Sequence, residues 1–323
     1  MNVRRFGRTG WSVGEIGYGM WGMAGWSGSD DPQSQAALDR AITLGVNLFD
    51  TALAYGEGHS ERLLGAAVRR HAGQKLWVAT KIPPKNRVWP SQRAFLLDDC
   101  FPPDYIKQST YQSLENLGLD RIDLQQFHVW EDRWSTDERW QRAIDDLKQE
   151  GVISALGISV NRWEPWNGVG AVLSGCIDAV QVIYNIFDQA PEDALFPLCV
   201  EKDVAIIARV PFDEGSLCGT LTAETTWPQG DWRNTYFVPE NLRATVERVE
   251  RLRPCLPPGM SLPELALRFI LSNPTVSTVI PGMRKPAHVA ANCATSDGQT
   301  LPPALKTALQ SHRWDRSPTR WSQ

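Results

Sequence analysis

Short apolar runs alternate with longer amphipathic segments along this chain. The short runs are rich in β-branched and aromatic residues and are apolar at nearly every position, which is typical of parallel strands covered on both faces. The runs predicted as strands are EIGYG, VNLFD, KLWVATK, RIDLQQFH, ISALGIS, AVQVIYN, VAIIARV and TVSTVIPG. A longer segment follows each run, which indicates a sheet built from repeated strand and helix units.

The longer segments carry apolar residues at helical spacing. In residues 103–118 the residues that share one helical face are Tyr105, Ile106, Thr110, Leu114 and Leu117. The first helix is expected to have Asp31 as its N-cap, because Pro32 then takes the first helical position. Further helices are expected in SERLLGAAVRRH, DERWQRAIDDLKQEG, RWEPWNGVGAVLSG, DALFPLCVEK, LPELALRFILSN and KPAHVAANCA.

Eight strand and helix pairs of this kind close most economically as a (β/α)8 TIM barrel. The N-terminal letters VRRF, GRTG and WSV predict a hairpin ahead of the barrel. No Pro/Ser-rich linker interrupts the chain, so we expect a single domain over 1–323, with a barrel core over about 13–296 and a C-terminal tail over 297–323. Two long βα connections, 83–101 and 211–239, are expected to act as lids or pocket walls.

Composition narrows the possible partners. The 323 residues are 42% hydrophobic, enough for a large core, and the formal net charge is -4. No block of Lys and Arg indicates nucleic-acid or membrane binding, and no apolar run reaches the length of a signal peptide or membrane span. We therefore expect a cytoplasmic protein with a small-molecule partner, its oligomeric state left open. No C-x-x-C pair occurs, so no metal site is expected, and mostly buried reduced thiols are predicted for Cys100, Cys176, Cys199, Cys218, Cys255 and Cys293.

A glycine-rich stretch near the first strand matches G-x-G-x-x-G from Gly17 to Gly22. A dinucleotide-binding Rossmann motif requires its third glycine to open a helix and an acidic residue about 20 positions later. Here the loop continues through Gly25 and Gly28, and the next acid at a strand end is Asp50. The sequence therefore favours glycines, Gly19 among them, that let the backbone approach a ligand.

Polar residues stand where three neighbouring strands end. Asp50 and Tyr55 follow the second strand, Lys81 the third and His128 the fourth. Barrel enzymes carry their chemistry at these strand ends. Such a set suits donation of a proton to a carbonyl oxygen while hydride reaches its carbon. A tyrosine has a pKa of about 10, which a nearby ammonium lowers, and an adjacent carboxylate keeps that ammonium charged.

In this interpretation Tyr55 is the acid, Lys81 lowers its pKa, Asp50 keeps Lys81 ionised, and His128 orients the carbonyl or relays the proton. Each residue by itself also has a structural explanation, as a turn cap, a packed ring, a solvated amine or a satisfied loop histidine. One shared explanation accounts for all of them at successive functional positions.

Several segments together resemble the aldo-keto reductase superfamily. They are GVNLFDTALAYGEGHSERLLG, WVATK, DLQQFH, LGIS and VIPGMRK, and the similarity runs from about Phe6 to Asn292. The resemblance implies a (β/α)8 barrel that binds NADP(H) and reduces aldehydes or ketones. It also implies a catalytic tetrad of Asp50, Tyr55, Lys81 and His128, with Tyr55 as the general acid.

The resemblance further implies cofactor-binding residues. Ser159 and Gln181 match residues that bind the nicotinamide carboxamide, and Asn161 stands one place beyond the usual asparagine. Arg209 replaces a tyrosine that stacks under the nicotinamide, so its guanidinium either stacks there or points elsewhere.

At the last strand, the amides of Gly282 and Met283 and the following helix N-terminus are expected to attract phosphate. Arg284 is expected to bind a 2′-phosphate, which favours NADP over NAD, or to be only a solvated charge. His288 and Asn292 stand where relatives contact adenine.

The leading hypothesis is thus an NADPH-dependent carbonyl reductase. One alternative is a cofactor-sensing regulatory subunit with little turnover, and another is a Schiff-base aldolase using Lys81 as nucleophile. Loop tryptophans either wall an apolar pocket or simply pack the long loops, namely Trp21, Trp26, Trp89, Trp130 and Trp232.

Overall fold

Strands that follow one another in the chain lie side by side in one eight-stranded sheet. The computed structural model describes residues 1–25, 28–161 and 164–316. The strands are β3 (Tyr18–Gly19), β4 (Leu48–Asp50), β5 (Trp77–Ile82), β6 (Ile122–Phe127), β7 (Ile153–Ser159), β8 (Ala179–Ile183), β9 (Ala205–Arg209) and β10 (Thr278–Val279). Every neighbouring pair is parallel.

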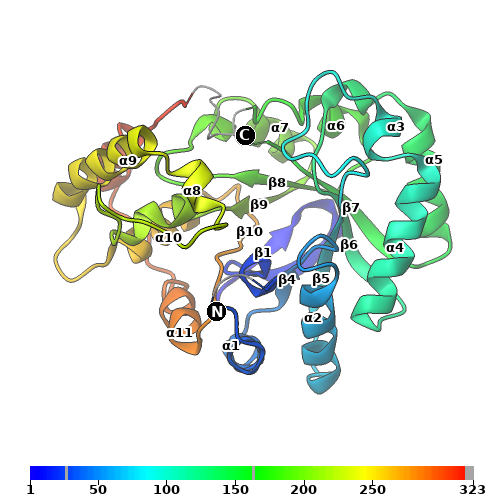
Figure 1. Cartoon of the computed structure of the whole chain (residues 1–323), viewed down its shortest axis with the longest axis horizontal. Helices are drawn as coiled ribbons and strands as arrows, with labels where there is room; N and C mark the ends of the chain where they lie inside the picture. Colours follow the sequence, from blue (N-terminus) through cyan, green and yellow to red (C-terminus); the bar gives the residue numbers. More distant parts are fainter. Residues whose placement is uncertain (26–27, 162–163, 317–323) are drawn as a thin grey trace.

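The first and last strands also meet, which closes the sheet into a barrel (Figure 1). Parallel bridges join Ile16 to Val279 and Gly19 to Gly282. The backbones approach so closely there that a Cβ at Gly19 would lie 2.6 Å from the carbonyl oxygen of Ile280. Only glycine fits at this position. The predicted (β/α)8 barrel is confirmed.

Helices surround the barrel in the predicted order (Figure 1). The eight helices that return the chain between strands, or follow the last one, are α1 (Asp31–Thr43), α2 (His59–Arg70), α4 (Pro103–Leu117), α5 (Glu138–Gln149), α6 (Val169–Ser174), α7 (Leu195–Glu201), α10 (Leu262–Leu271) and α11 (Pro286–Ala294). The long connections and the tail add α3 (Leu97–Cys100), α8 (Arg233–Tyr236), α9 (Pro239–Leu252) and α12 (Pro303–Gln310).

The expected cap of α1 was wrong by one residue. Asp30, not Asp31, is the N-cap, and its Oδ1 accepts a hydrogen bond of 2.9 Å from the amide of Gln33. Asp31 is already the first helical residue and Pro32 the second, where a missing N–H also costs no intrahelical bond.

The barrel interior changes from apolar to polar along its axis. Its apolar layer consists of Leu48, Ala79, Leu124, Ala155, Ala179, Ala205, Ile207 and Ile280, closed at one end by Phe6 and Val13. Because side chains on a strand alternate between faces, the residue two positions later points into the same interior. Those residues on β4, β5, β6 and β8 are Asp50, Lys81, Gln126 and Gln181. A layer of polar side chains therefore lies directly above the apolar floor.

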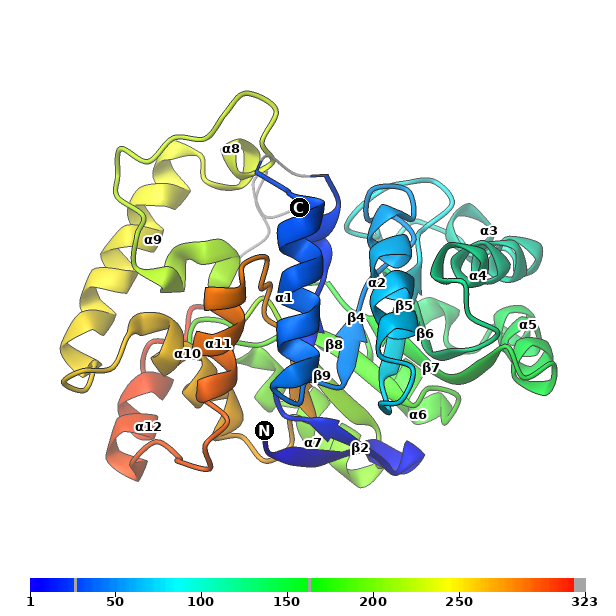
Figure 2. The ribbon, with the colours of Figure 1, turned by 90° about the horizontal axis from the view of Figure 1, so that it is seen from below.

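The predicted N-terminal hairpin is confirmed and closes the end of the barrel where the strands begin. Strands β1 (Val3–Phe6) and β2 (Trp11–Gly14) pair antiparallel, and they lie at the opposite end from α8 (Figure 2). Arg8 follows β1 and donates 2.8 Å from Nε to Oδ1 of Asp178, which Lys148 also contacts at 3.3 Å. These bonds brace the hairpin against the turn before β8.

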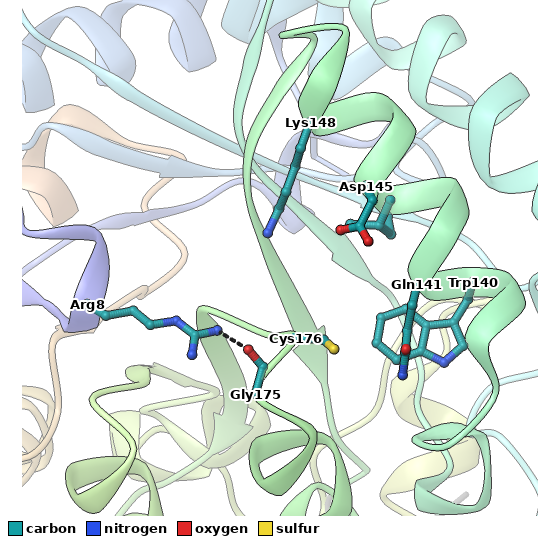
Figure 3. A pocket seen from close by; sticks show the side chains of 8 residues that line it. Arg8, Trp140, Gln141, Asp145, Lys148, Gly175 and Cys176 are labelled. Atoms are coloured by element: carbon teal, nitrogen blue, oxygen red, sulfur yellow. Dashed lines mark hydrogen bonds between the residues drawn. The ribbon is translucent and has the colours of Figure 1, made fainter.

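A hollow adjoins this brace (Figure 3). It is lined by Arg8, Trp140, Gln141, Ile144, Asp145, Lys148, Gly175 and Cys176. It lies on the outside of the barrel, and both of its cations are engaged by Asp178. It is separate from the polar layer inside the barrel.

The C-terminal segment is anchored on the loops that follow β8 and β9. The side chain of Arg316 is 1% exposed, and its Nη2 lies 2.6 Å from Oδ1 of Asp213 and 3.1 Å from Oδ2 of Asp188. Its Nη1 donates to the hydroxyl of Tyr236. Residues of the predicted tail thus tie two connections together at the C-terminal end of the barrel.

We expect Arg316→Ala to lower the free energy of unfolding by about 3 kcal/mol, because it removes the cation beside the buried Asp213 carboxylate. Urea unfolding measures the loss. Arg313→Ala is the matched control, since Arg313 pairs with the exposed carboxylate of Asp193 and should change stability by less than about 1 kcal/mol. Equal losses in the two variants would contradict a stabilising role for the buried contact.

All six cysteines are free. Cys100, Cys199 and Cys293 are buried, whereas the other three are partly exposed, so the expectation of mostly buried thiols holds for half of them. No group of three His, Cys, Asp or Glu side chains suited to a metal ion occurs in the described part of the chain. No described helix has both the length and the apolar character needed to cross a bilayer.

Candidate active site

The structure brings Asp50, Tyr55, Lys81 and His128 together at the C-terminal end of the barrel. Asp50 ends β4, Lys81 lies one residue before the end of β5, and His128 directly follows β6. Tyr55 lies in the turn between β4 and α2, where its amide donates to the carbonyl of Ala52 at 3.0 Å. Consecutive parallel strands place these ends side by side, as the sequence predicted.

The Lys81 ammonium is at the centre of the group. Its Nζ lies 2.5 Å from Oδ1 of Asp50, 2.8 Å from the carbonyl oxygen of Thr51 and 3.4 Å from the hydroxyl of Tyr55. The side chains of Lys81 and Asp50 are 1% and 3% exposed. An ammonium has three donors, so these contacts occupy all of them.

These contacts keep Lys81 charged. Burial by itself lowers the pKa of the amine, but the carboxylate of Asp50 and the hydroxyl of Tyr55 outweigh it, and the pKa of Lys81 lies above its usual value. A Schiff base requires a neutral attacking amine. The ion pair therefore disfavours Lys81 as a nucleophile.

Opposing effects set the pKa of Tyr55. Burial raises the pKa of the phenol above its usual value, and this effect outweighs the lowering by the Lys81 ammonium; the Asp50 charge raises it further. The expected lowering by Lys81 is present, but desolvation, on which strand spacing carries no information, outweighs it. The phenol accordingly holds its proton at neutral pH and is a donor, with Lys81 positioned to stabilise the phenolate left behind.

His128 is held neutral. Burial, followed by the positive charges of Lys81 and Arg209, places the pKa of His128 well below its usual value. The ring meets Tyr55 edge to face at a centroid distance of 5.5 Å, and it meets Trp89 at 5.8 Å. Its Nδ1 is buried and has no hydrogen-bond partner among the described residues. A neutral imidazole beside the phenol suits a carbonyl oxygen that needs orienting.

Two glutamines lie beneath the tetrad. Nε2 of Gln126 donates to Oδ2 of Asp50 at 2.9 Å, and Nε2 of Gln181 donates to the same oxygen at 2.8 Å. Gln181 also donates to Oε1 of Gln126 at 3.1 Å. Gln126 was not among the residues predicted for the site; the available signal was its place two residues after Leu124, on the inward face of β6.

The other predicted cofactor residues occupy neighbouring strand ends. Ser159 is buried at the end of β7 and lies in register with Gln181. Arg209 ends β9 and donates from Nη2 to the carbonyl of Val160 at 3.0 Å. Asn161 instead meets the long 83–101 loop, where its Nδ2 lies 3.4 Å from the carbonyl oxygen of Ser91.

The residues predicted for phosphate and adenine lie beyond β10. Gly282 is exposed and open space lies where a Cβ would stand, whereas Met283 is fully buried and its carbonyl accepts from Tyr18. The stem of Arg284 crosses the first βα loop, because a Cβ at Gly22 would lie 2.9 Å from Arg284 Cδ.

Positive charge gathers at the start of α11. His288 lies at the surface. Partial desolvation of its ring, followed by the charges of Lys285 and Arg284, lowers its pKa. Asn292 is buried farther along the helix. These groups place cations at a helix N-terminus, which suits an anionic ligand.

The loop tryptophans divide into two groups. Trp21 and Trp232 meet edge to face at 5.2 Å, and Trp21 and Trp89 are 40% and 41% exposed. Trp130 is fully buried and packs against Trp134 behind the barrel strands, so of the two alternatives for these indoles it follows packing and not a pocket wall. Its indole fills the space between β6 and its helices. Trp26 lies outside the described residues.

Comparison with known proteins agrees with this geometry. A model of the Aldo/keto reductase family matches residues 15–312. The uncharacterized oxidoreductase YqkF of Bacillus subtilis (strain 168) is 31% identical over 317 residues, which cover 97% of this chain and 96% of that protein. The NADH-specific methylglyoxal reductase of Escherichia coli (strain K12) is 28% identical over 309 residues, 89% of this chain and 91% of that protein.

Solved structures are similar over nearly the whole chain. The holo form of an aldo-keto reductase from Bacillus halodurans superposes with a TM-score of 0.77 at 26% identity, covering 100% of both chains. Glycerol dehydrogenase from Gluconobacter oxydans gives a TM-score of 0.79 at 26% identity, covering 96% of this chain and 94% of that one.

Proposed function

Because the chain belongs to the Aldo/keto reductase family, a family of oxidoreductases that act on small carbonyl substrates, we propose that it reduces an aldehyde or ketone with NADPH. The observation that carries this proposal is the contact of Lys81 with both Asp50 and Tyr55. In this arrangement the protonated phenol of Tyr55 lies beside the Lys81 ammonium, which Asp50 keeps charged.

The residues present fit a nicotinamide cofactor. His128 has a buried ring nitrogen without a described partner, and Ser159 lies at the strand end beside Gln181. Backbone near Gly19 and Gly282 lies close together with open space at Gly282. NADPH, when bound, supplies hydride to the carbonyl carbon.

In the proposed mechanism, Tyr55 donates its hydroxyl proton to the carbonyl oxygen. The Lys81 ammonium stabilises the resulting phenolate, and Asp50 holds the ammonium in place and charged. Neutral His128 donates a hydrogen bond that orients the carbonyl oxygen. The polar layer below the tetrad excludes bulk water from the Asp50 and Lys81 pair, whose side chains are almost fully buried.

We further propose how the cofactor is held. Ser159 and Gln181 would face the carboxamide, Arg209 would border the ring, and Asn161 would shape the wall toward the 83–101 loop. Residues at the last strand and α11 would hold the phosphate and adenine end, namely Gly282, Met283, Arg284, His288 and Asn292. The proposed catalytic unit is a single domain, 1–323, with its barrel core over about 13–296.

Arg284 should select NADPH. Arg284→Ala should weaken NADPH binding about tenfold or more and leave NADH nearly unchanged, since a charged hydrogen bond contributes about 1.5–3 kcal/mol. Quenching of tryptophan fluorescence gives both dissociation constants. Arg142→Ala, at an exposed arginine on α5, is the control. An unchanged NADPH to NADH ratio would remove Arg284 from the phosphate site and would favour the NADH preference named for the Escherichia coli relative.

Turnover tests the proposed activity. Loss of NADPH absorbance with a panel of aldehydes, ketones and sugars should identify substrates. Two relatives, a methylglyoxal reductase and a D-threo-aldose 1-dehydrogenase, suggest small oxo-aldehydes and aldoses for the panel. Cofactor that binds but is never oxidised would favour a sensing subunit instead. Borohydride trapping of substrate on Lys81 would favour an aldolase.

A further inference from the structure

The amide directions in the buried polar layer are set by Asp50. A carboxylate only accepts hydrogen bonds, so Gln126 and Gln181 must both turn Nε2 toward its Oδ2, at 2.9 and 2.8 Å. The second N–H of Gln181 then meets Oε1 of Gln126 at 3.1 Å. Both donors of Gln181 are occupied, and only its Oε1 is left for another partner.

Gln126 is held firmly enough to enforce this arrangement. It is fully buried on β6, and its Cγ lies 3.0 Å from where a Cβ at position 157 would stand. Glycine at 157 on β7 leaves the room that the glutamine stem occupies. Asp50 is thereby held from both sides, by Lys81 at Oδ1 and by the two amides at Oδ2.

We propose that Gln126 is a positioning residue that holds Asp50 in line with Lys81 and, together with Asp50, locks the Gln181 amide so that Gln181 meets the cofactor carboxamide only as a hydrogen-bond acceptor. This inference rests on the proposed function and deepens it. The locked Oε1 requires an N–H donor on the cofactor. A carboxamide NH2 satisfies it, and an acetyl group in the same place does not.

The chain contains a matched control. Gln125, the preceding residue on β6, is equally buried but points to the opposite face, and neither its Oε1 nor its Nε2 has a hydrogen-bond partner among the described residues. Gln125→Met removes an amide from the same strand without touching Asp50. It should leave both binding and turnover unchanged.

Binding tests the lock independently of turnover. Titration calorimetry with NADP+ and with its 3-acetylpyridine analogue should show that the wild-type protein prefers NADP+ by about tenfold. In Gln126→Met the Gln181 amide loses one of the two acceptors that fix it, so the freed N–H can meet the acetyl oxygen and the preference should fall to about threefold or less. Gln125→Met should keep the wild-type preference. A preference that Gln126→Met leaves unchanged overturns the lock.

The pH profile tests the effect on Asp50. In Gln126→Glu the introduced carboxyl can donate to Asp50 only while protonated, and burial and the neighbouring negative charge both raise its pKa. Its kcat relative to wild type should therefore approach that of wild type at about pH 5.5 and fall at least about tenfold by about pH 8.5. Gln126→Met should stay low throughout.

The charged and titratable groups that face this layer are Asp50, Tyr55, Lys81, His128 and Arg209. The wild-type protein contains the same groups, so dividing the kcat of the variant by that of wild type at each pH removes their contribution. If the kcat of Gln126→Glu relative to wild type did not change with pH, the positioning role of Gln126 would be overturned. A wild-type protein that binds NADP+ but oxidises no NADPH would instead refute the proposed function, while the preference for the carboxamide would still report on the lock.

Discussion

Tyr55→Phe should lower kcat for carbonyl reduction about 10²- to 10⁴-fold while leaving the dissociation constant for NADPH nearly unchanged. The substitution removes only the hydroxyl, whose contact in the described structure is with Lys81 at 3.4 Å. Single-turnover loss of NADPH absorbance measures the rate of the chemical step.

A second tyrosine serves as the control for this experiment. Tyr111 lies on the exposed side of α4 and donates to Glu150, so Tyr111→Phe should not change the rate. Equal losses in rate and in NADPH affinity for Tyr55→Phe would indicate that the phenol contributes to binding, and would contradict its role as proton donor.

Lys81→Met should have a comparably large effect through a different step. It removes the cation that lowers the pKa of the Tyr55 phenol, whereas burial and the Asp50 charge still raise it. The phenol becomes a weaker acid, and kcat should fall about 10²-fold or more at neutral pH. Steady-state kinetics between about pH 6 and pH 9 measure the change.

Stability must be measured alongside, because Lys81→Met also leaves the buried Asp50 without its counter-ion. Breaking such a pair costs about 3–5 kcal/mol. The double variant Asp50→Asn with Lys81→Met removes that penalty, so it should fold better than Lys81→Met yet remain inactive. Recovery of activity together with stability in the double variant would refute the electrostatic role of Lys81.

The order of strands and helices could be predicted from the sequence because each signal is local. Apolar runs and helical spacing depend on a few neighbouring residues, and eight repeats of strand and helix leave the closed barrel as the economical arrangement. The hairpin followed from a turn between two short runs in the same way. The N-cap of α1 was misplaced by one residue because Asp30 and Asp31 are equally good caps in the sequence.

The side chain of Trp130 shows what local sequence patterns do not predict. The sequence places it directly after a strand, among loop residues, and that placement is correct. Its indole nevertheless turns behind β6 and packs with Trp134 and Trp140, because space is available there between the strands and their helices. Which side of a loop a large ring occupies depends on residues distant in the chain.

The sequence by itself determined that Asp50, Tyr55, Lys81 and His128 share one end of the barrel, because parallel strands joined by helices all end on the same side. Only the tertiary structure decided that burial raises the pKa of Tyr55, that Arg316 joins two loops, and which way the Gln181 amide faces. Desolvation and hydrogen-bond direction depend on atoms that distant strands bring within a few ångströms, and no spacing along the chain encodes them.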